Sequence, residues 1–128
     1  MFNLIIRSIS ILFLLSFIHS AQAADAVAGK KIFNKCKACH SVDEGGKNKL
    51  GPNLWNIVGG PIAAKEKYKY SKALLAYAAE AGTWNEEKLD AWLKKPKDVV
   101  RKTKMIFAGL KKAEERANLI AFLKENGK

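Results

Sequence analysis

The chain has few of the residues from which most metal and redox sites are built. Its two cysteines are Cys36 and Cys39, and its two histidines are His19 and His40. Because His19 lies in a leader-like segment, the rest of the chain holds three such residues in all. A structural zinc site needs a full tetrahedral set of cysteine and histidine ligands. We therefore do not expect a zinc site.

Acidic residues and arginine are also scarce. There are 12 Asp and Glu residues against 23 Lys and Arg residues, and the formal net charge is +11. After residue 23 the only arginines are Arg101 and Arg116, and no basic stripe is interleaved with aromatic residues. Nucleic-acid-binding surfaces typically combine these features, so nucleic acid is disfavoured as a partner. The lysine excess favours an acidic partner surface instead.

No apolar run is long enough to span a membrane, which takes about 20 residues. The run at residues 4–18 is shorter than this, and Arg7 interrupts it. A short charged head, an apolar stretch and a small-residue cleavage site ending at Ala23 are typical of a secretory leader. We predict a cleavable leader at residues 1–23, a folded domain at residues 24–128 and a periplasmic location. A retained N-terminal anchor is the less favoured alternative.

Strand-like alternation, internal repeats and low-complexity tracts are absent, which predicts a single all-α domain. Helical periodicity and capping signals predict four short helices. A capping box of Thr83 and Glu86 is expected to open the third helix, and Pro96 to end it. The other three are expected at about residues 26–35, 71–82 and 112–126. Residues 41–69 remain as a long loop, which is unusual in a compact domain unless something organises it.

Cys36, Cys39 and His40 form the pattern Cys-x-x-Cys-His, the attachment signature of c-type haem. In that reading the two cysteines form thioethers to one porphyrin, and the adjacent histidine is an axial ligand of the iron. One covalently bound haem would also organise the loop at residues 41–69 and cover apolar surface that four short helices leave exposed. A plain disulfide remains an alternative. A thioredoxin-like dithiol would need βαβ surroundings, and no strands are expected.

Met105 is the only methionine outside the leader. Its neighbours Ile106 and Phe107 are typical of core packing, where methionine often fills space. However, it follows Pro96 in a stretch without clear periodicity. Ligation by histidine and methionine raises the potential of a haem iron and suits electron transfer. The residues favour Met105 as a second iron ligand over core filler.

Six motifs follow one another along residues 25–127: GKKIFNKCKACH (29–40), GPNLWNIVG (51–59), KYSKA (69–73), Thr83-Trp84, TKMIFAGLK (103–111) and LIAFLK (119–124). In these motifs the chain resembles the mitochondrial-type class I cytochromes c and their alphaproteobacterial relatives. The resemblance implies the class I cytochrome c fold, in which short helices and long loops surround one covalently bound haem c. It also implies a soluble, monomeric electron carrier of the respiratory chain rather than an enzyme.

The resemblance assigns roles around the iron. His40 and Met105 become its two axial ligands. The carbonyl of Pro52 is expected to accept a hydrogen bond from the His40 ring and to fix its orientation. The Thr103 hydroxyl is expected to support the loop that carries Met105.

The resemblance also assigns roles at the carboxylate end of the haem and where two helices cross. Tyr70 and Trp84 match positions that hydrogen-bond the haem propionates. Gly60 stands where many relatives place an arginine near a propionate, so a charge partner is missing there. The first and last helices are expected to cross through four residues, namely Gly29, Phe33, Leu119 and Phe122.

Two further departures lie near Met105. Trp92 replaces the usual tyrosine, and Arg101-Lys102 replaces a common Pro-Gly pair before the distal loop. The tryptophan removes a hydroxyl donor from the distal side, and the loss of the proline loosens the loop. Both departures imply a weaker bond between Met105 and the iron.

Six lysines match family positions that ring the exposed haem edge: Lys35, Lys49, Lys97, Lys104, Lys111 and Lys112. We interpret Lys65, Lys67, Lys88 and Lys128 as ordinary surface residues. The implied partners are acidic docking surfaces of membrane redox complexes. These are a quinol-cytochrome c reductase as electron donor and a terminal cytochrome c oxidase as acceptor, with no small-molecule substrate.

Two other functions stay open from the sequence. A haem peroxidase would need an open iron position and a distal acid–base group, and the only histidine after the leader, His40, is used on the proximal side. A haem-free dithiol oxidoreductase would use Cys36 and Cys39 directly. The absorption spectrum of the protein separates these functions from an electron carrier.

Overall fold

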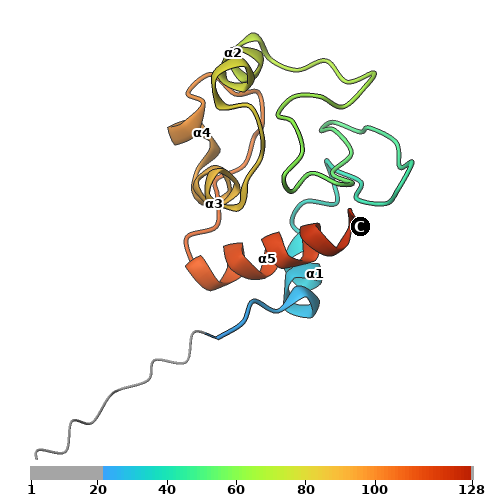
Figure 1. The fold of residues 1–128 in the computed structure, drawn as a ribbon, viewed down its shortest axis with the longest axis vertical. Coiled ribbons are helices and arrows are strands. Elements are labelled where there is room, and N and C mark those ends of the chain that lie inside the picture. Colours follow the sequence, from blue (N-terminus) through green and yellow to red (C-terminus); the bar gives the residue numbers. More distant parts are fainter. Residues whose placement is uncertain (1–21, 128) are drawn as a thin grey trace, which may run out of the picture.

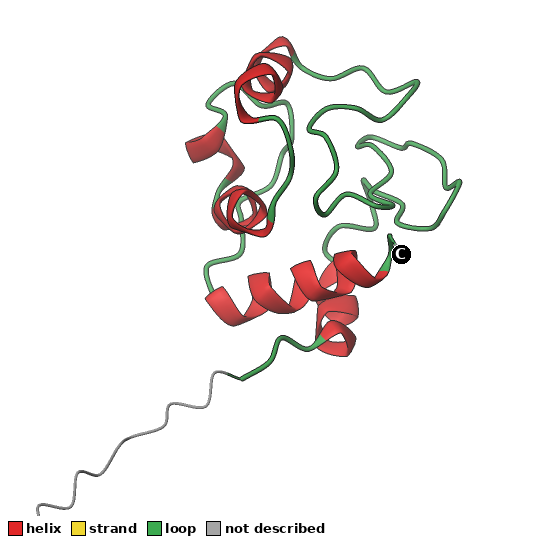
Figure 2. Ribbon diagram, in the orientation of Figure 1, coloured by secondary structure: helices red, strands yellow, loops and turns green. Residues whose placement is uncertain are grey.

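The computed structural model describes residues 22–127. The expected leader lies outside this range except for its last two residues, which are exposed chain. Five helices follow in order: α1 (Ala26–Phe33), α2 (Lys72–Ala81), α3 (Glu86–Lys94), α4 (Pro96–Val99) and α5 (Ala113–Glu125) (Figure 1). Within the described range no strand forms (Figure 2), and the only isolated bridge there pairs Pro61 with Thr83. The predicted all-α class is confirmed.

The ends of α1 and α2 are set by the residues that the sequence indicates. The Asp25 carboxylate accepts hydrogen bonds from the backbone N–H groups of Val27 at 2.8 Å and Ala28 at 3.1 Å, which caps α1. The Ser71 hydroxyl caps α2 in the same way. Gly82 ends α2 with φ = 75°, a left-handed value that glycine adopts at little cost.

The predicted capping box of α3 is wrong. The helix is capped by Asn85, whose side-chain oxygen accepts from the Lys88 N–H at 2.8 Å. Thr83 is instead part of the bridge with Pro61, where extended backbone precedes the helix. Asparagine is at least as good an N-cap as threonine. Because the bridge holds Thr83, the cap forms at Asn85, which lies directly before the helix.

Pro96 ends α3 as expected, but it also starts α4, a short helix that the sequence did not indicate. Lys95 between the two helices is extended, as a residue before proline tends to be. Proline suits the first position of a helix because that N–H has no partner there anyway. One residue therefore separates α3 from α4.

α1 and α5 cross at close range, and Figure 1 shows α5 lying over α1. A Cβ atom on Gly29 would lie 1.9 Å from the Asn118 carbonyl oxygen and 2.8 Å from Cβ of Phe122, so only glycine fits. The rings of Phe33 and Phe122 pack with centroids 5.4 Å apart. Leu119 is 1% exposed. The predicted crossing is confirmed.

The rest of the core is built on α3. Its buried side chains are Leu89, Trp92 and Leu93, and the Trp92 ring packs against that of Trp84 with centroids 5.3 Å apart. α3 also contacts α5. Opposite α2 and α3, the long loop at residues 41–69 forms the other side of the molecule (Figure 1). No helix of the described residues is long and apolar enough to cross a membrane.

Candidate functional site

A cavity of about 520 Å³ lies between the helices and the long loop. One part of its wall holds Cys36, Cys39 and His40, and another holds the segment 103–107, which includes Met105. Much of the remaining wall is apolar, with side chains from the loop, α2, α3 and α5: Leu54, Leu74, Trp92, Leu93, Leu119 and Leu123. A cavity of this size in the centre of a small domain would be unfavourable if it stayed empty.

The two cysteines lie in a tight turn directly after α1. The backbone N–H groups of Cys39 and His40 both donate to the Cys36 carbonyl, at 3.1 and 2.9 Å. The turn brings both thiols to the cavity wall, where they are half-buried and free rather than joined as a disulfide. Burial, and secondarily the nearby Cys39, raise the pKa of the Cys36 thiol, which Lys35 only partly opposes. This is the reverse of the low pKa that a dithiol oxidoreductase needs in its attacking cysteine.

The His40 ring is buried and held in one orientation. Its Nδ1 lies 2.7 Å from the Pro52 carbonyl oxygen, so the predicted hydrogen bond is present and the N–H on Nδ1 donates to it. The other ring nitrogen is then left without a proton, as a metal ligand requires. Burial lowers the pKa of His40, Lys49 lowers it further, and the Pro52 carbonyl only partly offsets this, so the neutral imidazole is favoured.

The loop that carries Met105 is held by hydrogen bonds within the loop and to the end of α3. The Thr103 hydroxyl accepts from the Met105 N–H at 3.2 Å. Further along, the Leu110 N–H donates to the Leu93 carbonyl at 2.8 Å. Gly109, with φ = 103°, lies so close to α3 that a Cβ would be 2.0 Å from the Lys94 carbonyl oxygen.

Arg116 of α5 fixes the same loop from the other side. Its guanidinium is buried and donates to the carbonyls of Leu110 and Lys111, both at 2.9 Å. It also pairs with the Asp90 carboxylate of α3 at 2.7 Å. Sequence reasoning did not single out Arg116, because a lone arginine on a helix gives no signal of the carbonyls it will meet.

Tyr70, Trp84 and Thr103, expected at the cofactor, all line the cavity. Trp84 is held by backbone hydrogen bonds to Gly59 and Gly60, which lie in the turn before Pro61. The Tyr70 hydroxyl oxygen accepts from the Lys65 N–H at 3.1 Å. Burial raises the pKa of Tyr70, so the hydroxyl keeps its proton and can donate it to a group in the cavity.

The interpretation of Lys65 as an ordinary surface residue is wrong. Its side chain is half-buried, lines the cavity and donates from Nζ to the Trp55 carbonyl. The position of Lys65 between Gly60 and Tyr70, both matched to the carboxylate end of the haem, was the available signal.

The residues present fit a covalently bound haem c. Two thiols and a neutral imidazole lie on one part of the wall, a thioether on another, and apolar side chains line much of the rest. Among the described residues, no group of three or more His, Cys, Asp and Glu side chains could hold a metal ion on its own. The set therefore suits an iron that arrives with its own porphyrin better than a bare metal ion.

Comparison with known proteins decides the family. The family model for cytochrome c matches residues 26–127. The chain belongs to the cytochrome c family. The cofactor of this family is covalent haem c, and its members are electron-transfer proteins rather than enzymes. The predicted family, fold class and cofactor are confirmed.

Individual relatives agree with this assignment. The chain is 48% identical over 103 residues to a cytochrome c homolog of Rickettsia prowazekii, covering 80% of this chain and 57% of that protein. It is 44% identical over 104 residues to cytochrome c2 of Afifella marina, covering 80% and 84%. The solved structure of cytochrome cH from Methylobacterium extorquens superimposes with a TM-score of 0.73 at 38% identity, covering 80% of this chain and 99% of that one. The chain thus spans little more than half of the Rickettsia relative and nearly all of cytochrome cH.

Proposed function

We propose that this cytochrome c is a soluble, monomeric single-electron carrier whose haem has His40 and Met105 as axial ligands. It works in the periplasm, after removal of the leader at residues 1–23. It takes electrons from a quinol-cytochrome c reductase and passes them to a terminal cytochrome c oxidase. The observation that carries the proposal is the hydrogen bond from His40 Nδ1 to the Pro52 carbonyl, beside a cavity that Cys36, Cys39 and Met105 also line.

The haem supplies an iron that gains and loses one electron, and the residues of the chain decide how it does so. Cys36 and Cys39 would hold it through thioether bonds. His40, neutral and fixed by Pro52, would ligate the iron from its free ring nitrogen. Thr103 keeps the Met105 backbone in place. Apolar walls exclude water, so little rearrangement accompanies a change of charge on the iron.

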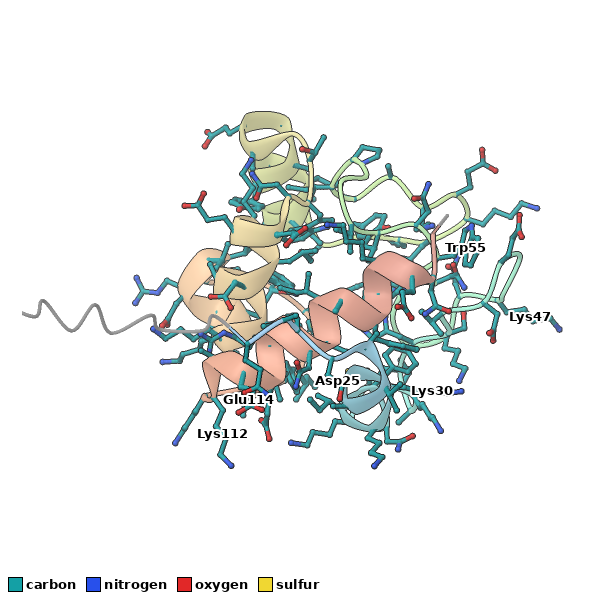
Figure 3. All side chains as sticks on the ribbon, turned by 60° about the horizontal axis from the view of Figure 1, so that its bottom comes forward. Asp25, Lys30, Lys47, Trp55, Lys112 and Glu114 are labelled. Atoms are coloured by element: carbon teal, nitrogen blue, oxygen red, sulfur yellow. The ribbon has the colours of Figure 1, made fainter. Side chains whose placement is uncertain are left out.

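The surface around the cavity mouth supports docking to an acidic partner. Lys35 and Lys104 contribute to the cavity lining, beside two apolar residues that are largely exposed, Leu50 at 80% and Ile106 at 98%. An apolar centre with charged neighbours is the usual composition of a transient interface. Lysines outside this lining, such as Lys30 and Lys47 in Figure 3, also extend into solvent. They add to long-range attraction without marking a docking face.

The absorption spectrum and a redox titration of the purified protein test this function. We expect sharp low-spin c-type bands in both oxidation states, full reversibility, and no binding of peroxide. A high-spin spectrum with ready peroxide binding would favour a peroxidase instead. A protein without covalent haem would rule out the proposal.

A further inference from the structure

The side chain of Lys65 turns inward from a loop whose other charged residues point to solvent. Its neighbours Glu66 and Lys67 are exposed, whereas Lys65 is half-buried and lines the cavity. Its ammonium donates to the backbone carbonyl of Trp55. Lys65 therefore places a positive charge beside an otherwise largely apolar cavity.

No carboxylate in the described part of the chain pairs with this ammonium. The ion pairs there are Lys35–Glu115, Lys95–Asp98, Arg116–Asp90 and Lys124–Glu86. Burial lowers the pKa of Lys65, which shows that the surroundings disfavour its charge. A partly desolvated cation whose one partner is a carbonyl is stabilised further when an anion faces it.

The position of Lys65 indicates what that anion is. Its backbone N–H donates to the Tyr70 hydroxyl oxygen at 3.1 Å, and Trp84 lines the same cavity. Tyr70 and Trp84 match the family positions that hydrogen-bond the haem propionates. The carboxylates of the family's cofactor are thus the anions expected next to Lys65.

Gly60, which also lines the cavity, cannot supply the arginine that many relatives carry at its position. A Cβ atom at Gly60 would lie 2.8 Å from the Asn56 carbonyl oxygen, so the backbone here is fitted to glycine. We propose that Lys65 supplies the positive charge at the propionate end of the haem site that Gly60 lacks. This inference rests on the haem site of the proposed function, but not on Met105 as a ligand or on the redox partners.

The proposal has two electrostatic consequences for the haem protein. A nearby cation disfavours the extra positive charge of ferric iron, so it raises the reduction potential. It also favours ionised propionates and therefore lowers their pKa. Removing the cation should lower the potential and move the titration of the propionates to higher pH.

The test compares Lys65→Gln with Lys67→Gln in the full holoprotein, by spectroelectrochemical titration across pH. Glutamine keeps a donor for the Trp55 carbonyl and removes the charge. Lys67 is a matched control because it is exposed, lies two residues away and loses the same charge. We expect Lys65→Gln to lower the midpoint potential several times more than Lys67→Gln, and to move the pH-dependent region upward. Lys65→Arg should keep both properties of the wild type.

Equal shifts in the two glutamine variants, or an unchanged pH dependence in Lys65→Gln, would overturn the inference. If Lys65→Gln folds poorly, Lys65→Arg still tests the inference. This variant keeps the charge, so a loss of the wild-type pH dependence in it would contradict a role for that charge. A wild-type protein without covalent haem would instead contradict the proposed function. The two failures are therefore distinguishable.

Discussion

The His40 ring is confined on two sides by consecutive residues. The Pro52 carbonyl accepts its Nδ1–H at 2.7 Å, and Gly51 leaves room for the ring, since a Cβ there would lie 2.3 Å from Cε1. The Gly-Pro pair thus sets both the orientation and the tautomer of the proposed ligand. The Cys-x-x-Cys-His motif alone predicts that His40 is a ligand. The fit of its ring against Gly51 can be seen only in the three-dimensional structure.

Replacing Met105 with alanine should leave the haem attached and most of the helix intact, because neither depends on the thioether. We expect a lower reduction potential, faster binding of small ligands such as azide by the ferric protein, and some peroxidase activity. Potentiometry and ligand-binding kinetics measure this. The control is Ile106→Ala, since Ile106 is 98% exposed. Similar azide kinetics in wild type and Met105→Ala would show that Met105 does not occupy the iron.

Among the elements, the buried faces of α1 and α5 could be predicted from apolar periodicity, which is a local feature. That the two helices cross at Gly29 was implied by the family resemblance instead. The cap of α3 could not be predicted, since the choice between Thr83 and Asn85 depends on the bridge from Thr83 to Pro61, which is distant in sequence. α4 was missed because its four residues are too short to show periodicity. Lys65 was missed because its position between Gly60 and Tyr70 suggests proximity to the cofactor, whereas the inward direction of its side chain depends on the conformation of the whole loop.

The helix crossing leads to a prediction for Gly29. Its added Cβ would meet the Asn118 carbonyl at 1.9 Å, and backbone on both helices would have to move. We expect Gly29→Ala to lower the free energy of unfolding by about 1–3 kcal/mol or more, the usual cost of overpacking. Denaturant unfolding of the holoprotein measures this.

Val27→Ala is the matched control in the same helix, because Val27 is 71% exposed. That variant should stay within about 0.5 kcal/mol of the wild type. A Gly29→Ala protein as stable as Val27→Ala would mean that the helices can separate at no cost.

The long loop carries three non-glycine residues with left-handed backbone: Asn56, Ala63 and Lys67, with φ of 54°, 56° and 58°. Such a conformation costs an L-residue about 1–2 kcal/mol. Glycine would remove that strain, but its greater conformational freedom in the unfolded chain would cost the fold about 0.5–1 kcal/mol. Lys67→Gly should therefore raise the free energy of unfolding by about 0.5–1 kcal/mol.

Lys69→Gly provides the opposite control. Lys69 is exposed in the same loop and is not among the left-handed residues, so glycine there brings only the entropy cost. Urea unfolding should show the two variants changing stability in opposite directions. A Lys67→Gly variant less stable than wild type would contradict the assigned strain.

At the scale of the whole molecule, the proposed docking face should dominate association with acidic redox partners. Charge reversal at Lys35 or Lys111 should slow the bimolecular electron-transfer rate more than reversal at Lys67, and added salt should shrink the gap. Exposed charges are screened beyond about 8 Å at physiological ionic strength. Stopped-flow kinetics at several salt concentrations measure this. Lys65 is unsuitable as a control because it lines the cavity. Equal rates for all three variants would indicate a diffuse charge without a docking face.

The central cavity leads us to expect that the fold depends on its cofactor. Without haem, about 520 Å³ lined largely by apolar side chains would have to collapse or fill with water. The double replacement Cys36→Ala and Cys39→Ala should therefore abolish covalent haem and leave a largely unfolded chain. Circular dichroism at physiological temperature is the measurement. A compact, helical double variant would show that the helices hold together unaided.

The half-buried thiols also bear on the order in which haem attachment and folding take place. In a chain that folded before haem was attached, Cys36 would lie on a shielded wall where burial raises the pKa of its thiol, so little of the reactive thiolate would be available. In an open chain the same thiol is accessible and ordinary. We therefore expect attachment to precede closure, with the segment around Met105 settling last over a group that is already bound. A chain that folds before haem is attached would therefore shield its thiols and would no longer react with haem.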